Sequence, residues 1–156
     1  MQIEFYPTSF EANTTAIDMV CYTIASMEPN YLWYKDTDFD IHIGDTYREK
    51  GFMQATQMPL SKGFVLYPNI LDAAQKVYEL NSMKTDPFPY VMVKCTIPCR
   101  SRYYNGTERG GRLFSTVCAE RIKVEGWKKV GEREWHTVLE GDDGERYNTY
   151  FNIVTE

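Results

Sequence analysis

The chain has 156 residues, a net charge of −5 at pH 7, and 15% aromatic residues, including 12 tyrosines. This length suits one domain that buries a core without metal or disulfide support. The negative charge and the lack of a long basic run argue against a general nucleic-acid binder, because neutralising phosphates requires local positive charge. The sequence shows neither a signal-peptide pattern nor an apolar run of membrane-spanning length, so we expect a cytoplasmic protein.

The N-terminal part, residues 1–38, predicts a strand followed by a helix. Apolar and polar side chains alternate over Gln2–Tyr6, which is typical of a strand. Thr8 and Glu11 then form a capping-box pattern, and apolar residues recur behind them at helical spacing. We therefore predict a long first helix over Phe10–Met27.

An acidic turn separates this part from the next predicted strand, Phe39–Ile43. Three aspartates alternate with other residues over 36–40, but the glycine and the distal glutamate of an EF-hand are not at the required spacing. We interpret the aspartates as a solvated turn and predict no metal site. His42 points away from its isoleucine neighbours, and Gly44 lets a ligand approach the backbone closely. The segment 47–51 predicts a short polar turn or helix.

Residues 61–97 carry the clearest structural pattern of the chain. Phe64–Tyr67 is a short apolar and aromatic run bounded by glycine and proline, which predicts a buried strand. Asn69 can cap a helix over Ile70–Leu80, whose apolar residues recur at helical spacing. Tyr90–Ile97 alternates its two faces. We therefore expect a strand–helix–strand unit.

The remaining third of the chain predicts a long loop, a long strand and a hairpin. Glycine, asparagine and arginine dominate Pro98–Arg112, which predicts a polar loop whose arginines can form an anion site. Leu113–Val124 predicts one long strand. Glu134–Glu140 and Arg146–Val154 flank an aspartate- and glycine-rich turn, which predicts a terminal hairpin.

Glu120 is the first candidate for a functional side chain. It shares one face of the predicted strand with apolar residues, and a carboxylate in such company is costly unless it is paired or lies at a cleft. The alternative is that Glu120 lies at a strand end or edge and reaches water. The four cysteines lack the spacing of a zinc site, so we expect reduced thiols.

The order of these segments resembles small ADP-ribosyltransferase-like domains of the phage and bacterial toxin type. The similarity spans residues 39–127, and its motifs are, in order, Ile41–Gly44, Lys50–Phe52, Phe64–Tyr67 with the helix at Asp72–Ala74, Ile97–Pro98, and Cys118–Ile122. A second alignment sets Phe5–Ser9 as the first motif and leaves His42 without a role.

This resemblance implies an NAD site made by a histidine, a tyrosine and a glutamate. His42, with Gly44 nearby, would hold an NAD ribose, and Tyr67 would stack on the nicotinamide. Glu120 would be catalytic, because a carboxylate beside the ribose stabilises the oxocarbenium-like transition state. The acceptor would be a macromolecule, either a protein or a nucleic acid.

We therefore expect a single α+β domain over residues 1–156, with a mostly antiparallel sheet that can be split and two main helices. Its core would cover 39–127, preceded by a strand and helix and followed by a hairpin over 128–156. The resemblance implies an NAD-dependent ADP-ribosyltransferase-like protein without a membrane part, acting in the host cytoplasm if phage-encoded. The alternative is a non-enzymatic binding protein, for example a phage inhibitor of a host factor, whose aromatic and acidic surface contacts the partner.

Overall fold

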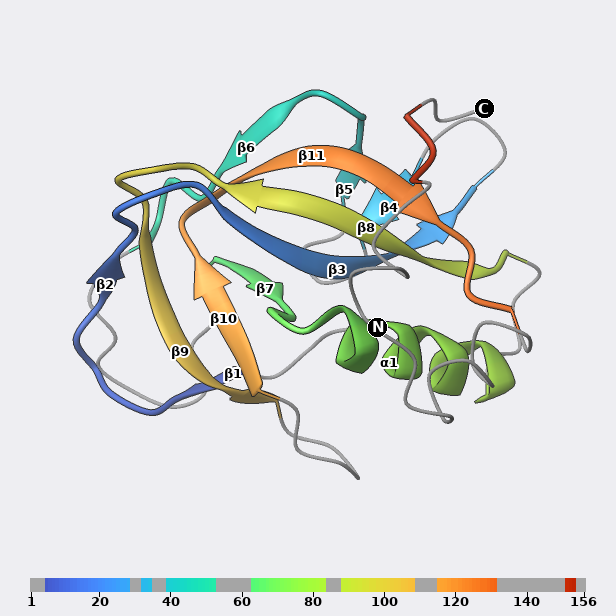
Figure 1. The fold of residues 1–156 in the computed structure, drawn as a ribbon, viewed down its shortest axis with the longest axis horizontal. Coiled ribbons are helices and arrows are strands. Elements are labelled where there is room, and N and C mark those ends of the chain that lie inside the picture. Colours follow the sequence, from blue (N-terminus) through green and yellow to red (C-terminus); the bar gives the residue numbers. More distant parts are fainter. Residues whose placement is uncertain are drawn as a thin grey trace.

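The computed structural model describes residues 5–28, 32–34, 39–52, 63–83, 88–108, 115–131 and 151–153 (Figure 1). The helix is α1 Ile70–Met83. The strands are β1 Phe5–Pro7, β2 Asn13–Thr14, β3 Met19–Met27, β4 Leu32–Tyr34, β5 Phe39–Ile41, β6 Thr46–Arg48, β7 Phe64–Leu66, β8 Tyr90–Ile97, β9 Arg102–Glu108, β10 Ser115–Ala119 and β11 Arg121–Lys128.

The strands form two antiparallel sheets. Sheet A has the order β1-β9-β10-β7, with β2 also paired to β9, and sheet B has the order β5-β4-β3-β8-β11-β6. One edge of sheet A touches sheet B, because Tyr22 and Tyr67 exchange backbone hydrogen bonds of 2.8 and 2.6 Å. The protein is therefore a single mostly antiparallel domain with a split sheet, as the sequence predicts.

Sheet B curls along its length. Its end strands β5 and β6 are separated in the chain by only the four residues 42–45. Six strands laid flat would put those ends about 24 Å apart, whereas this linker spans at most about 18 Å. The turn is held against β11, because Gly44 N–H donates to the Val124 carbonyl (2.7 Å) and Val124 N–H donates to the Asp45 carbonyl (3.0 Å).

Besides the crossings into and out of β7, the chain makes three short crossings between the sheets, from β2 to β3, from β8 to β9 and from β10 to β11. These crossings meet at one corner, which we call the sheet corner and define by residues 15–18, 98–101 and 120–121. Thr15 N–H donates to the Ser101 carbonyl and Arg100 N–H to the Thr15 carbonyl, both at 2.9 Å. Arg100 has a φ of 66°, a conformation that few non-glycine residues adopt, so the turn here is tight.

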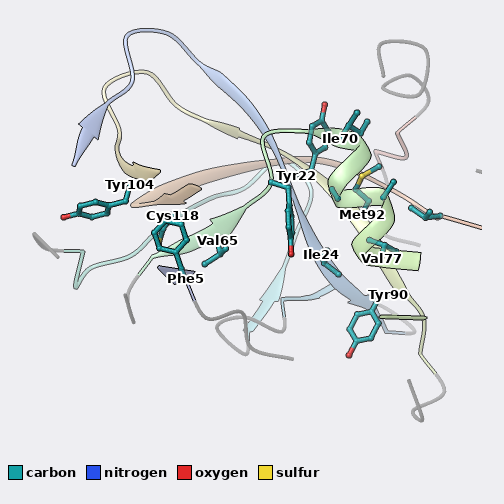
Figure 2. Close-up of a cluster of buried hydrophobic side chains, with 14 of the residues drawn as sticks. Phe5, Tyr22, Ile24, Val65, Ile70, Val77, Tyr90, Met92, Tyr104 and Cys118 are labelled. Carbon is teal, nitrogen blue, oxygen red and sulfur yellow. The ribbon is translucent and has the colours of Figure 1, made fainter. Parts of the chain in front are cut away.

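Two apolar cores cover opposite faces of the sheets. The inter-sheet core takes one face of each sheet, as alternation along a strand requires; it includes Val91, Val93, Cys95 and Ile97 of β8 and Val117 and Ala119 of β10. The helix-side core takes the other faces, and α1 packs on it over β3 and β8 (Figure 2). Its members include Phe5, Tyr22, Ile24, Val65, Val77, Met92 and Tyr104.

The predicted strand–helix–strand unit is confirmed. β7 followed by Tyr67 matches the predicted Phe64–Tyr67 strand, α1 starts at Ile70, and β8 has the predicted bounds. Asn69 caps the helix, because its Oδ1 accepts the Leu71 N–H at 2.9 Å. The proline before Asn69 was therefore sufficient to predict the end of the strand, and the apolar stripe was sufficient to predict the helix.

The predicted helix over Phe10–Met27 is wrong, and so is the expectation of two main helices. Among the described residues α1 is the one helix, and β2 and β3 occupy the predicted first one. β3 is buried on both faces between the two cores, so it lacks the alternation that marks a half-exposed strand. Its residues Val20–Ile24 are largely β-branched or aromatic, which favours a strand.

Two smaller predictions are also wrong, and a third is confirmed in part. The predicted loop Pro98–Arg112 contains β9, and the predicted strand Leu113–Val124 is interrupted at Glu120. Of the turn or helix predicted at 47–51, β6 covers the first two residues and a turn follows at 50–51. The terminal hairpin lies outside the described residues except for Phe151–Ile153, where Asn152 forms a bridge with Trp127. No helix within the described ranges is long and apolar enough to span a membrane.

Two glycines give a test of this packing. A Cβ at position 106 would collide with the Tyr6 carbonyl oxygen and lie 2.7 Å from the Phe5 ring, whereas a Cβ at position 44 meets no atom within 4 Å. We expect Gly106→Ala to cost at least about 2–3 kcal/mol of unfolding free energy through overpacking between β1 and β9. Gly44→Ala should cost only about 1–2 kcal/mol, from its φ of +92°. Urea unfolding measures both, and equal losses would contradict the packing of β1 on β9.

Candidate functional site

The structure places His42 at an exposed turn of sheet B. Its Nε2 lies 3.0 Å from Asp40 Oδ2, and both side chains are about half exposed (52% and 54%). Its backbone N–H donates to the Tyr47 hydroxyl oxygen at 2.8 Å. Gly44 lies two residues on, in the turn that contacts β11. The position is open to solvent and is held by local contacts.

Tyr67 is fully buried, with 0% of its surface exposed. Its hydroxyl donates to Glu108 Oε2 at 2.6 Å, and Lys76 Nζ of α1 lies 3.6 Å from the other Glu108 oxygen. The ring belongs to the helix-side core and presents no exposed face on which a nicotinamide could stack. Tyr67 therefore links β7 to β9 and α1.

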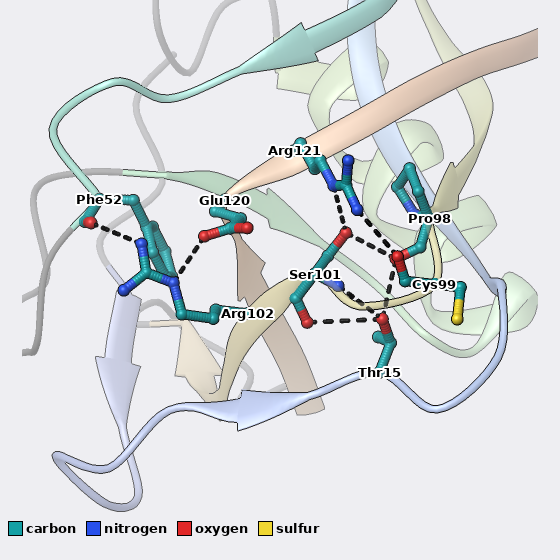
Figure 3. A network of polar contacts seen from close by, with 8 residues as sticks. All are labelled: Thr15, Phe52, Pro98, Cys99, Ser101, Arg102, Glu120 and Arg121. Carbon is teal, nitrogen blue, oxygen red and sulfur yellow. Dashed lines mark hydrogen bonds and ion pairs between the residues drawn. The ribbon is translucent and has the colours of Figure 1, made fainter.

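Glu120 is nearly buried, with 5% exposed, at the point where the chain leaves sheet A for sheet B. Its Oε2 accepts the Arg102 Nε–H at 2.7 Å (Figure 3). Arg102 also donates from Nη2 to the Phe52 carbonyl at 3.2 Å, and its guanidinium lies over the Phe52 ring, 5.5 Å from the centroid. The carboxylate is thus paired, which offsets the cost of burying it among the apolar residues of its strand.

The three sequence-predicted residues therefore belong to three different sets of contacts. Tyr67 and Glu120 lie in or beside sheet A, and the register of Val65 opposite Cys118 puts both on the same face by alternation. His42 belongs to sheet B. Sheet A does contain β1 as well, so the second alignment, with Phe5–Ser9 as first motif, brings β1, β7 and the end of β10 before Glu120 into one sheet.

A hollow of about 250 Å³ lies next to the Arg102–Glu120 ion pair. It is lined by Glu11, Ala12, Arg102 and Tyr104. The Arg102 side chain is half exposed (49%), in contrast to its buried partner Glu120. This hollow, the ion pair and Phe52 form the candidate site. Its scale suits one side chain or a small ligand group, because drug-sized pockets start at about 300 Å³.

Glu108 is a buried carboxylate that we did not predict from the sequence. It lies in the segment that we predicted as a polar loop, where no buried side chain was expected. Residues Tyr104, Gly106 and Glu108 occupy one face of β9. Burial raises the pKa of Glu108 above its ordinary value, although the Tyr67 hydroxyl and Lys76 oppose that shift. The signal that could have revealed this strand is the placement of Tyr104, Gly106 and Glu108 at alternate positions of a polar segment.

The predicted arginine anion site is only partly described. Arg102 lies at the hollow and Arg100 at the sheet corner, whereas Arg109 and Arg112 lie outside the described residues. Arg121 was not predicted as important, yet it donates to Ser101 Oγ (2.7 Å) and the Cys99 carbonyl (2.8 Å). Arg121 thus has a structural role at the sheet corner.

The cysteines are free thiols, and three of the four are buried. Burial raises the pKa of Cys21 to about 12 and also raises that of Cys95, its cross-strand neighbour. Thiols in this state are weak nucleophiles and weak metal ligands. The described part of the chain holds no cluster of His, Cys, Asp or Glu suited to a metal ion.

Comparisons with known proteins give no relative. No protein-family model matches the chain, and neither a curated protein nor a solved structure does. Only the site itself can therefore indicate a function.

The Arg102–Glu120 pair yields the first prediction for this site. Arg102→Ala leaves a buried carboxylate unpaired, so we expect a loss of about 2–3 kcal/mol in unfolding free energy. The double variant Arg102→Gln, Glu120→Gln keeps the side-chain lengths and removes both charges, so it should lose markedly less. Thermal and urea unfolding of the variants measure this difference. Equal losses would show that Arg102 stabilises the fold through Phe52 packing and not through the charge.

Glu108 yields a pH-dependent prediction. A folded pKa raised above the ordinary 4.5 means that the folded state favours the protonated carboxyl. The stability contributed by this group is complete below pH 4.5 and is lost as the pH rises through the folded pKa. The free energy of unfolding of the wild type minus that of Glu108→Gln should therefore fall with rising pH across that window. A difference that grows with pH would mean that the Lys76 ion pair outweighs burial.

Proposed function

We propose that this chain is a non-enzymatic binding protein that contacts a partner protein with the surface around the hollow beside Arg102. The observation that carries this proposal is the contrast within the site. Glu120 Oε2 and the Tyr67 hydroxyl are bound by internal partners, whereas half of the Arg102 side chain faces solvent. A group that is oriented by the fold and still exposed is suited to contact a partner.

The side chains around the hollow support a protein partner. Phe10 is 41% exposed and directly precedes Glu11 and Ala12, which line the hollow. Arginine, tyrosine and phenylalanine are enriched in protein interfaces, and Arg and Tyr often carry most of the binding energy. The surface defined by Phe10, Glu11, Ala12 and Arg102 is called the contact surface below.

NAD-dependent ADP-ribosyl transfer to a macromolecule is the second candidate, and one observation favours it. Sheet A contains β1 and β7, and Glu120 lies beside it, where its N–H donates to the Arg102 carbonyl. The second alignment of the resemblance requires these three parts of the chain. In this structure, however, Glu120 is only 5% exposed with its Oε2 bound by Arg102, and Tyr67 has no exposed ring face. These two features make binding without chemistry the better supported function.

NAD separates the two candidates. An NAD site saturated about tenfold above its dissociation constant would add about 1.4 kcal/mol of stability, or roughly 3–6 °C in melting temperature for a chain of this size. We expect no such shift from NAD and no release of nicotinamide. Both a shift and nicotinamide release that Glu120→Gln reduces at least about a hundredfold would establish the transferase instead.

Photocrosslinking tests the contact surface directly. A photoreactive residue replacing Phe10 should give a discrete protein adduct in an extract of the source or host cells, and Arg102→Lys should weaken it. The same residue replacing Met83, which is 73% exposed at the end of α1, provides the matched control. Adducts that form equally from both positions, or that ignore Arg102, would contradict a specific contact at this surface.

A further inference from the structure

The Arg102 guanidinium is fixed in place yet only partly used. Its Nε–H is bound by Glu120, one N–H of Nη2 by the Phe52 carbonyl, and one face is covered by the Phe52 ring. Figure 3 shows the third guanidinium nitrogen directed away from both acceptors. Within the described ranges that nitrogen, Nη1, has no hydrogen-bond acceptor. The arginine is therefore an oriented donor that still offers a ligand its Nη1, which we call its outer edge.

The outer edge of an arginine matches a carboxylate. The guanidinium presents parallel N–H groups at the spacing of two carboxylate oxygens, and such charge-assisted bonds are stronger than neutral ones. Because Glu120 and Phe52 already hold the guanidinium, a ligand would not have to order this side chain on binding.

The charges around the hollow limit the ligand to one negative charge. Arg102 is neutralised by Glu120, and Glu11 adds a further carboxylate to the lining. A doubly charged phosphate meets more repulsion from these carboxylates than a singly charged group does. The chain's net charge of −5 also gives no long-range attraction for anions, so binding must depend on the direct contact.

We infer that the hollow is a carboxylate subsite that takes one aspartate or glutamate side chain of the partner protein, bound at the outer edge of Arg102. This inference rests on the proposed binding function and adds the chemistry of the contact. Ala12 and Tyr104 would pack against the short aliphatic stem of that side chain. Glu11 opposes the ligand charge and thereby keeps the subsite weak.

The direct experiment titrates the whole protein with N-acetyl-glutamate N-methylamide and follows the Arg Nε–H resonances by NMR. The Arg102 signal, identified by its loss in Arg102→Lys, should shift saturably with a dissociation constant on the order of 10 mM, as expected for a single charged contact. The uncharged N-acetyl-glutamine N-methylamide should leave it unchanged, and inorganic phosphate should bind more weakly than the glutamate derivative.

Two substitutions of opposite effect sharpen the test. Glu11→Gln removes the opposing charge from an exposed position and should tighten binding about two- to fivefold, the scale of one screened surface interaction. Asp45→Asn, an equal charge change on the exposed turn of sheet B, should leave the affinity unchanged. The double variant Arg102→Gln, Glu120→Gln lacks the Arg102 signal, so its backbone amide signals at Ala12 and Tyr104 are followed instead; they should show no saturable shift, and no buried carboxylate is left unpaired.

The outcomes separate the subsite from the contact surface. The subsite would be overturned by any of three results: no saturable shift, an equal shift with the glutamine derivative, or weaker binding by Glu11→Gln. In that case, a protein adduct from the photoreactive residue at position 10 would still support the contact surface. A specific shift without any adduct would retain the carboxylate subsite for free carboxylic acids and overturn its assignment to a partner protein.

Discussion

The sheet corner is the constraint on which the rest of the structure depends. Three strand crossings meet there, and each leaves backbone groups that neither sheet can pair. The Pro98 carbonyl accepts the hydroxyls of Thr15 (2.8 Å) and Ser101 (2.6 Å), and Ser101 N–H donates to Thr15 Oγ1 (2.9 Å). Arg121 completes the network (Figure 3). Because Arg102 follows Ser101 and Glu120 precedes Arg121, the same network fixes the two halves of the candidate site.

Sheet A carries two nearly buried carboxylates on one face, and each helps to link its strands to a segment outside the sheet. Glu108 connects β9 to Tyr67 after β7 and to Lys76 of α1. Glu120 connects the end of β10 to Arg102 of β9 and, through that arginine, to Phe52. Removing the partner of a buried carboxylate of this kind destabilises the fold, because the carboxylate is then left unpaired. The side chains expected to do chemistry are thus engaged in holding sheet A together.

The sequence predicted those elements whose local signals agree with their environment. The apolar stripe of α1 and the alternation of β8 each match one buried face, and Asn69 marks the helix start. The prediction for β3 was wrong because burial on both faces removes the alternation of apolar and polar residues. Its apolar residues also fit a helical spacing. Glu120 was identified as a costly carboxylate, but its partner Arg102 is 18 residues away, and only the pairing of β9 with β10 brings them together. Periodicity along one strand contains no information on such cross-strand partners.

The geometry of the ion pair also bears on which functions the site can support. A ligand that needs Glu120 Oε2 has to break a 2.7 Å charge-assisted bond to a nearly buried carboxylate, which costs free energy before any gain. A ligand that needs only the outer edge of Arg102 adds a contact and leaves the existing pair intact. Under the proposed binding function, Glu120 acts indirectly, by orienting the guanidinium of Arg102. The carboxylate that the resemblance assigns to catalysis would then be a positioning group.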